Sequence, residues 1–228
     1  MTTDTEILHE LAALGTEQNR KIFGRHGVGA NMYGVSYANL GALKKRLKTD
    51  HALALRLWAS GNHDARVLAL MIADPQQIDS ATLDSWVQEL DNYVIVDAFS
   101  SFIGSSPLAR QKAEQWIESD DEWTGDAGWS LIGQLALKDS SLPDAYFEPY
   151  LARIERDLHG SKNRVRHAMN NAVIAIGVRS DVLEAEAVAA AGRIGKVVVD
   201  HGKTDCKTPD AIAYIAKTRA RRAEKKKA

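Results

Sequence analysis

One carboxylate stands in an otherwise apolar helical pattern. Between Leu83 and Phe102, apolar and aromatic side chains recur at intervals of three and four residues, which predicts a helical region. Asp97 falls within this stripe, one helical turn after Tyr93. Because burying an unpaired carboxylate is costly, Asp97 is either a structural acid of low exposure beside a cation or donor, or a site acid at the floor of a cleft.

Basic side chains gather in the last third of the chain. Residues 1–150 contain 12 Lys and Arg against 21 Asp and Glu, whereas residues 151–228 contain 17 against 9, and the formal net charge of the whole chain is −1. A basic C-terminal third fits a phosphate-bearing partner; the alternative is two oppositely charged faces within one domain. Basic groups at the start of a predicted helix suit phosphate contacts, although a solvated first turn would look the same. The four candidate DNA contacts are Lys162, Arg164, Arg166 and His167.

A polar stretch near the C-terminus holds the single cysteine of the chain, Cys206. With His201 it could form a nucleophilic pair, and together with Asp200 and Asp205 these two residues could bind a metal. The spacing matches no standard zinc pattern, and no other hydrolase motif accompanies the pair. We therefore expect a structured loop here, with no metal and no cofactor.

The sequence lacks the signals of a membrane or secreted protein. It has no long uncharged apolar run, and its acidic N-terminus, Met1 to Glu6, is unlike a signal peptide. A single cysteine excludes an internal disulfide framework and suits a reducing compartment. These features predict a cytoplasmic protein with no membrane partner, and they indicate no particular protein partner.

Nearly every segment of the chain predicts a helix, and short breaks separate the helices. Glycine, asparagine and proline mark these breaks, and no strand pattern alternates with the helices. Helix pairs of about 35–45 residues match repeats of the HEAT or armadillo kind. We predict an all-α, right-handed α-solenoid of antiparallel helix pairs, with a compact helical bundle as the alternative. It would form a single domain over residues 1–216, followed by a frayed basic tail over residues 217–228. The clearest breaks are Gly61-Asn62, Asp74-Pro75, Gly104 to Pro107 and Leu142-Pro143.

Several stretches of the sequence resemble the bacterial DNA alkylation repair proteins, the AlkD-like alkylpurine DNA glycosylases built from HEAT-like repeats. The resemblance runs from about Leu11 to about Ala191, and the segment from Ile194 to Pro209 resembles the loop of one branch of that family. The residues that carry it are Tyr33 to Ser36, His63 to Leu70, Trp86 with Tyr93 to Asp97, and Asn163 to Asn170.

The resemblance implies a DNA-binding groove and a particular reaction. Glycosylases of this family hold duplex DNA and release cationic N3- or N7-alkylated purines without flipping the base into a pocket. Their site is an Asp flanked by two Trp residues and an Arg. Such a carboxylate can stabilise the oxocarbenium-like sugar that remains when the base leaves, and aromatic faces favour a cationic lesion.

The matching positions of this sequence keep only part of that site. Asp97 matches the site carboxylate, and Tyr93 stands where the family has a Trp. The Arg should fall within Gly125 to Gly128, which holds no basic residue, and the second Trp should fall near Asn171. We therefore expect a protein that binds duplex, damaged or branched DNA with weak or absent base excision. The alternatives are an active glycosylase that uses Asp97, and a helical-repeat scaffold that binds protein.

Overall fold

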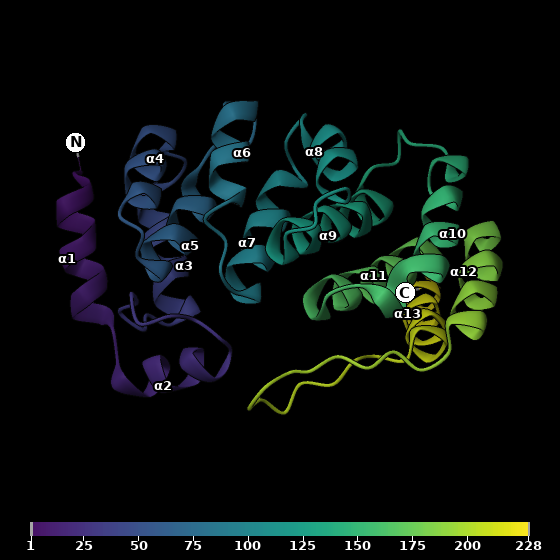
Figure 1. Ribbon diagram of the computed structural model, residues 1–228. Helices are drawn as coiled ribbons and strands as arrows, with labels where there is room; N and C mark the ends of the chain where they lie inside the picture. Colours follow the sequence, from purple (N-terminus) through teal and green to yellow (C-terminus); the bar gives the residue numbers. More distant parts are fainter. Residues whose placement is uncertain (1, 228) are drawn as a thin grey trace. The chain divides into compact units, whose positions relative to one another are not determined.

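The computed structural model describes residues 2–227, and within them all regular secondary structure is helical, without a β-strand (Figure 1). The all-α fold is confirmed. Contacts within the chain divide it into two compact units, Met1–Leu108 with Gly202–Thr204, and Ala109–His201 with Asp205–Ala228. The single domain expected over residues 1–216 stays a prediction. No helix within residues 2–227 combines the length and the apolar character that a bilayer crossing requires.

The first unit contains seven helices among its described residues. Each break predicted within it falls between two helices, because glycine, proline and capping side chains end the intrahelical hydrogen bonding there. The helices are α1 (Asp4–Leu14), α2 (Glu17–Arg25), α3 (Tyr37–Leu47), α4 (His51–Ala59), α5 (His63–Ile72), α6 (Ser80–Val87) and α7 (Tyr93–Ile103).

Aromatic stacking forms the centre of the first unit. The Trp58 ring of α4 stacks on the Trp86 ring of α6, with centroids 4.2 Å apart and planes 9° apart. Phe99 of α7 lies against Trp58 at 6.0 Å. Contacts of this kind add about 0.5–1.5 kcal/mol each beyond the burial of the rings. The core therefore fixes the rotation of α7, and with it the direction in which Asp97 points.

A buried carboxylate ties the segment before α3 to α5. Asp64 accepts three backbone hydrogen bonds, from Tyr33 at 2.6 Å, Gly34 at 3.0 Å and Val35 at 2.8 Å. Gly34 has a φ of +81°, and a Cβ there would lie 2.7 Å from the carbonyl oxygen of Thr16. Only glycine fits this turn without strain, and the turn fixes the start of α3.

The second unit contains six further α-helices and two short 3₁₀ helices among its described residues. The most extensive contacts join α9 to α11 and α8 to α9, and α11 also packs against α12 and α13. Their bounds are α8 (Ala109–Trp116), α9 (Glu122–Lys138), η1 (Asp144–Tyr146), α10 (Glu148–Asp157), η2 (Leu158–Gly160), α11 (Asn163–Gly177), α12 (Asp181–Ile194) and α13 (Ala211–Lys227).

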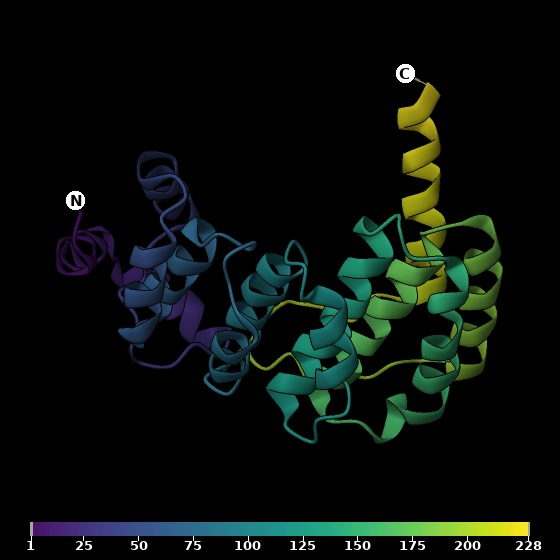
Figure 2. The same cartoon turned by 90° about the horizontal axis from the view of Figure 1, so that it is seen from above.

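The basic C-terminal stretch is helical rather than frayed. Residues 217–227 continue α13, which extends away from the other helices of its unit (Figure 2). Its first turns are fixed by Ile215, which is fully buried. A Cβ at Gly177 of α11 would lie 2.6 Å from the Ile215 side chain, so the two helices approach closely at that glycine.

Candidate nucleic-acid interface

The first unit has an open groove that contains Asp97. We call it the Asp97 groove; its volume is about 610 Å³, and α3, α5 and α7 supply its walls. Apolar side chains form most of the lining, with one carboxylate, one ammonium group and two phenol rings among them. The lining residues are Tyr37, Lys44, Val67, Leu70, Met71, Tyr93, Val94, Asp97, Ala98, Ser101 and Phe102.

Asp97 is exposed, so the expectation of a low-exposure structural acid is wrong, and the alternative of an acid facing a cleft holds. The buried face of α7 is formed by Ile95, Val96, Phe99 and Ile103. Asp97 lies on the opposite side of the helix, together with Val94 and Ser101, which also line the groove. Apolar residues occupy nearly every side of α7, and for that reason the pattern alone did not reveal which side is buried.

Tyr93 is half-buried in the wall of the Asp97 groove. Its hydroxyl group forms a hydrogen bond with Nδ1 of His26, and the two rings meet edge to face with centroids 5.9 Å apart. His26 follows the last residue of α2. Sequence reasoning missed His26, since it read the segment only as a loop and gave no sign that the loop reaches α7.

A second tyrosine, Tyr37, completes the aromatic lining. It is the first residue of α3, whose start is capped by Ser36, with Ser36 Oγ accepting from the Asn39 backbone N–H at 3.2 Å. Partial burial, followed by the negative charges of Asp97 and Asp64, raises the pKa of Tyr37. Its hydroxyl group therefore stays protonated at neutral pH and remains a hydrogen-bond donor near the carboxylate.

These groups suit a nucleic acid for three reasons. The Asp97 carboxylate is accessible, so it can stabilise a positive charge that develops on a bound molecule. The Tyr37 and Tyr93 rings can contact the faces of bases. Lys44 can contact a phosphate group at the rim, and Lys45 beside it is also exposed.

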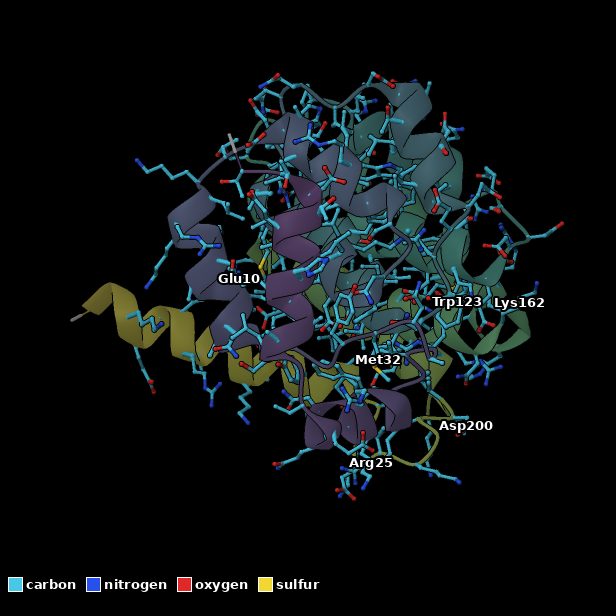
Figure 3. The ribbon with its side chains drawn as sticks, turned by 90° about the vertical axis from the view of Figure 1, so that its left-hand side faces the viewer. Glu10, Arg25, Met32, Trp123, Lys162 and Asp200 are labelled. Atoms are coloured by element: carbon cyan, nitrogen blue, oxygen red, sulfur yellow. The ribbon has the colours of Figure 1, made fainter. Side chains whose placement is uncertain are left out.

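Two of the four basic residues predicted in the second unit contact backbone carbonyls. Lys162 is exposed at the surface (Figure 3), and its Nζ donates to the Asp120 carbonyl oxygen at 2.6 Å. Arg166 donates from Nη1 to the Val198 carbonyl oxygen at 2.7 Å and from Nη2 to the Ser161 carbonyl oxygen at 3.1 Å. Arg166 thus holds the segment that follows α12, whereas Lys162 lies at the surface.

The third residue, Arg164, is buried beside a carboxylate. Arg164 is 7% exposed and Asp126 of α9 is 2% exposed, and Arg164 Nε lies 3.8 Å from Asp126 Oδ2. Ser130 donates from Oγ to Asp126 Oδ1 at 3.3 Å. The family pattern places an arginine at this part of α9. Within Gly125 to Gly128, where the arginine is expected, only Asp126 is charged, and α11 supplies a guanidinium group next to it.

The fourth residue, His167, is neutral at physiological pH. Burial, followed by the positive charge of Arg164 and then by His201, lowers the pKa of His167 to about 4. The His167 and His201 rings meet edge to face with centroids 5.4 Å apart. The interaction of His201 with Thr208, Nε2 to Oγ1, spans 3.0 Å. His167 therefore adds no positive charge at neutral pH and instead packs against the polar segment.

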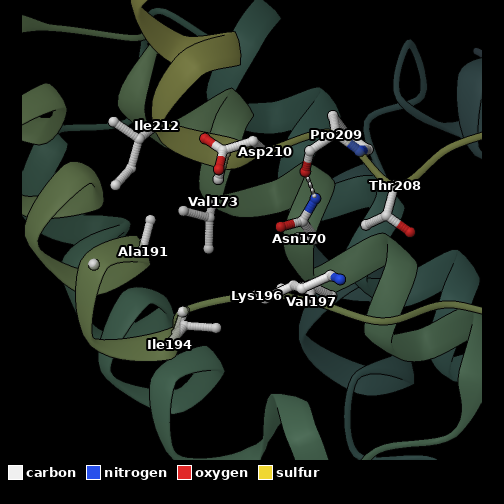
Figure 4. Close-up of a pocket in the computed structure, with 13 residues that line it drawn as sticks. Asn170, Val173, Ala191, Ile194, Lys196, Val197, Thr208, Pro209, Asp210 and Ile212 are labelled. Carbon is white, nitrogen blue, oxygen red and sulfur yellow. Dashed lines mark hydrogen bonds between the residues drawn. The ribbon is translucent and has the colours of Figure 1, made fainter.

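The segment between α12 and α13 is held by side chains of α11, as the structured-loop interpretation requires. The Asp200 backbone N–H donates to Asn163 Oδ1 at 2.7 Å, and Asn163 Nδ2 donates to the Asp200 carbonyl oxygen at 2.8 Å. Asn170 Nδ2 donates to the Pro209 carbonyl oxygen at 3.0 Å, in the wall of a cavity of about 510 Å³ (Figure 4). Among residues 2–227, no three His, Cys, Asp or Glu side chains converge as metal ligands.

The chain is similar to known proteins over nearly its whole length. The family of DNA alkylation repair enzymes matches residues 7–215. Two uncharacterised proteins, from Listeria innocua and Listeria monocytogenes, are each 33% identical to this chain, over 97% of this chain and 99% of their own length. A solved structure with a TM-score of 0.88 and 29% identity covers 96% of this chain and 95% of its own. It is described as a new family related to the HEAT-like repeat DNA glycosylases, with affinity for branched DNA structures.

Proposed function

This chain belongs to the DNA alkylation repair enzyme family, and on that premise we propose that it is a DNA-binding protein that contacts DNA through the Asp97 groove. The observation that carries the proposal is the position of Asp97. It lies on the solvent side of α7, in a groove that also holds Tyr37, Tyr93 and Lys44. A carboxylate, two aromatic faces and a cation in one depression fit a nucleic acid better than an apolar protein helix.

Branched DNA is the form that we expect this protein to prefer. The solved relative has affinity for branched DNA structures, and its fold matches this chain over almost the whole length. Lys162, exposed at the start of α11, is a further proposed phosphate contact. Arg164 and Arg166 lie in the same helical turn. Arg164 pairs with Asp126, and Arg166 donates to the carbonyl oxygens of Val198 and Ser161, so both stabilise the local fold rather than offer an unpaired charge to DNA.

Base excision by this protein is weak or absent in our proposal. The reaction needs a carboxylate beside the developing sugar cation, which Asp97 can supply, and it also needs the lesion to be held against it. Tyr93 replaces a larger indole ring, no basic residue stands within Gly125 to Gly128 where an arginine is expected, and Asn171 stands near the second tryptophan position. Loss of one positioning contact costs on the order of a hundredfold in rate.

An active glycosylase is the second candidate, and two observations favour it. Asp97 is accessible in a groove, and Arg164 brings a guanidinium group to the α9 position where the family pattern expects one. If these groups suffice, the protein would release N3- or N7-alkylated purines, with Asp97 as the site carboxylate and Tyr93 as its aromatic neighbour.

Two measurements on the same proteins test the proposal. The first is the affinity for blunt duplex, methylated duplex and junction DNA at several salt concentrations; binding through phosphates weakens steeply as salt rises. If the protein bound none of these DNA forms, or if its affinity did not change with salt, the proposal would be contradicted and a protein-binding scaffold favoured.

The second measurement is release of methylated base from alkylated duplex DNA by the wild type and by Asp97→Asn. Glu186→Gln is the matched control, since it removes one exposed carboxylate from α12. Negligible release by all three proteins is the expected result. Robust release by the wild type and by Glu186→Gln, but not by Asp97→Asn, would establish the glycosylase instead.

A further inference from the structure

The second unit has a groove of its own between α11 and α13, which we call the α11–α13 groove. Its volume is about 530 Å³. The floor is apolar, and polar or charged groups stand around it. The lining residues are Leu137, His167, Asn171, Ile174, Ala175, Val178, Lys207, Pro209, Tyr214, Thr218 and Arg222.

Two large side chains at this groove are exposed to solvent. Tyr214 is 49% exposed and Leu137 is 45% exposed. The next residue of α13, Ile215, is fully buried and fixes the helix against α11. Because Ile215 sets the rotation of α13, the Tyr214 ring is presented at the groove by a fixed helix. A ring held in this way can stack on a flat molecule with little loss of conformational freedom.

Positive charges outnumber negative ones around the groove. Lys207 and Arg222 belong to its lining. Lys217, Arg221 and Lys225 follow Tyr214 at spacings of 3, 7 and 11 residues, so they share its side of α13, and all three are exposed. We call these three residues the basic face of α13.

One carboxylate, Glu224, lies three residues after Arg221 on the same side of α13, so the basic face keeps three cations against one acid. Asp181 and Glu184 of α12 pair with Arg219, the latter through Arg219 Nε at 2.7 Å from Glu184 Oε2. Arg219 lies on another side of α13 from Tyr214, since five residues rotate a helix by about 500°, which leaves the two side chains about 140° apart around the axis. Figure 2 shows that the outer turns of α13 extend beyond the helices of its unit, where a long polyanion can reach the basic face.

We propose that the α11–α13 groove binds an unpaired nucleobase stacked on Tyr214, while the sugar-phosphate backbone of the same strand follows the basic face of α13. An aromatic platform beside a row of cations is the usual arrangement for single-stranded nucleic acid. A fully paired duplex keeps its bases stacked inside, so it cannot fill an apolar groove in this way. The inference rests on the proposed DNA binding and adds a second contact surface that selects DNA with unpaired bases.

Tyr214→Ala tests the stacking contact. Fluorescence anisotropy would compare a blunt duplex with the same duplex carrying a short single-stranded tail. We expect the wild type to prefer the tailed DNA, and Tyr214→Ala to lower the affinity for the tail by about five- to a hundredfold, with blunt-duplex binding unchanged. Tyr214→Phe keeps a ring and should keep the preference, which separates stacking from loss of the hydroxyl group.

The double variant Lys217→Ala, Arg221→Ala tests the backbone contact. It should flatten the salt dependence of tailed-DNA binding by about 0.7 in log–log slope for each phosphate group that the variant no longer neutralises. The matched control is Arg156→Ala, Arg193→Ala, which removes the same charge from exposed residues of α10 and α12 that pair with Asp157 and Glu155. Circular dichroism would confirm that every variant is folded.

The outcomes separate this inference from the proposed function. A wild type that binds blunt and tailed DNA equally, or a Tyr214→Ala variant that keeps the full preference, overturns the groove assignment and leaves DNA binding in place. If both double variants change the salt dependence of tailed-DNA binding by the same amount, the backbone path along α13 is overturned. A wild type that binds neither these DNAs nor junction DNA overturns the proposed function together with this inference.

Discussion

The backbone N–H of Val35 donates a hydrogen bond of 2.8 Å to the buried carboxylate of Asp64, and so the segment before α3 is fixed to the first turn of α5. Tyr33 and Gly34 donate to the same carboxylate. Tyr37 begins α3 directly after this segment, so its place in the Asp97 groove depends on an aspartate that does not line the groove.

Replacing Asp64 with asparagine should destabilise the protein. The amide group has one acceptor oxygen, and its NH₂ group would face backbone donors, so at least one buried N–H loses its partner. We expect the free energy of unfolding to fall by about 2–4 kcal/mol, measured by urea denaturation. Glu186→Gln, which removes an exposed carboxylate, should leave it nearly unchanged. Equal stability of the two variants would show that the three hydrogen bonds contribute little.

Replacing Gly34 with alanine should also destabilise the protein. The φ of +81° is unfavourable for alanine, and the new Cβ would meet the Thr16 carbonyl oxygen at 2.7 Å. The expected loss is about 2 kcal/mol or more. A Cβ added at Gly41 within α3 would have nothing within 4 Å, so Gly41→Ala should stabilise by up to about 1 kcal/mol. Thermal melts of both variants would check this opposite sign.

The hydrogen bond between His26 and Tyr93 should matter for DNA binding as well as for folding. Tyr93→Phe keeps the ring but removes the hydroxyl group that bonds to His26 Nδ1. We expect a loss of about 1 kcal/mol in stability and a three- to tenfold weaker affinity for junction DNA, because the ring is held less firmly. His26→Ala should give a similar result. A variant with unchanged affinity would remove this contact from the site.

Arg164 and Asp126 should be strongly coupled. Arg164→Ala removes the guanidinium group beside a carboxylate that is 2% exposed, so it should cost about 2 kcal/mol or more, and the double variant with Asp126→Ala should regain part of that loss. The Arg193–Glu155 pair, at 2.7 Å, is the control and should show much weaker coupling, because solvent screens its charges. Similar coupling energies in both pairs would indicate that burial does not strengthen the interaction between Arg164 and Asp126.

The stability of the protein should fall in mild acid because of His167. In the unfolded chain this imidazole takes up a proton near pH 6.5, whereas burial and Arg164 lower its pKa to about 4 in the folded protein. Between these values the unfolded state binds the additional proton, so stability is complete above pH 6.5 and decreases as pH falls towards 4. His167→Asn should remove a pH-dependent loss of about 1–3 kcal/mol. Urea denaturation at pH 7 and at pH 4.5 would check it. If the free energy of unfolding fell by the same amount in the wild type and in His167→Asn, the assignment would be contradicted.

Local signals in the sequence were sufficient for most of the helices and drew attention to one candidate site residue. Breaks such as Gly61-Asn62 and Asp74-Pro75 act within a few residues, so the helix limits beside them could be predicted. The break before α7, where Asn92 is the cap, was missed because the apolar spacing continues across it. The position of Asp97 in an apolar segment marked it as unusual, because an acid there must face either a partner or solvent. The family resemblance then assigned a role to both Asp97 and Tyr93.

The tertiary structure decided which groups surround Asp97 and Tyr93. α7 is apolar on nearly every side, so only its packing against Trp58 shows that Asp97 faces solvent. His26 lies 67 residues from its partner Tyr93, and Arg164 lies far along the chain from Asp126. Such contacts arise when separate helices pack, and hydrophobic periodicity records only which side of a helix is apolar. For the same reason, Arg164 looked like a surface cation in the sequence and is a buried ion-pair partner in the folded protein.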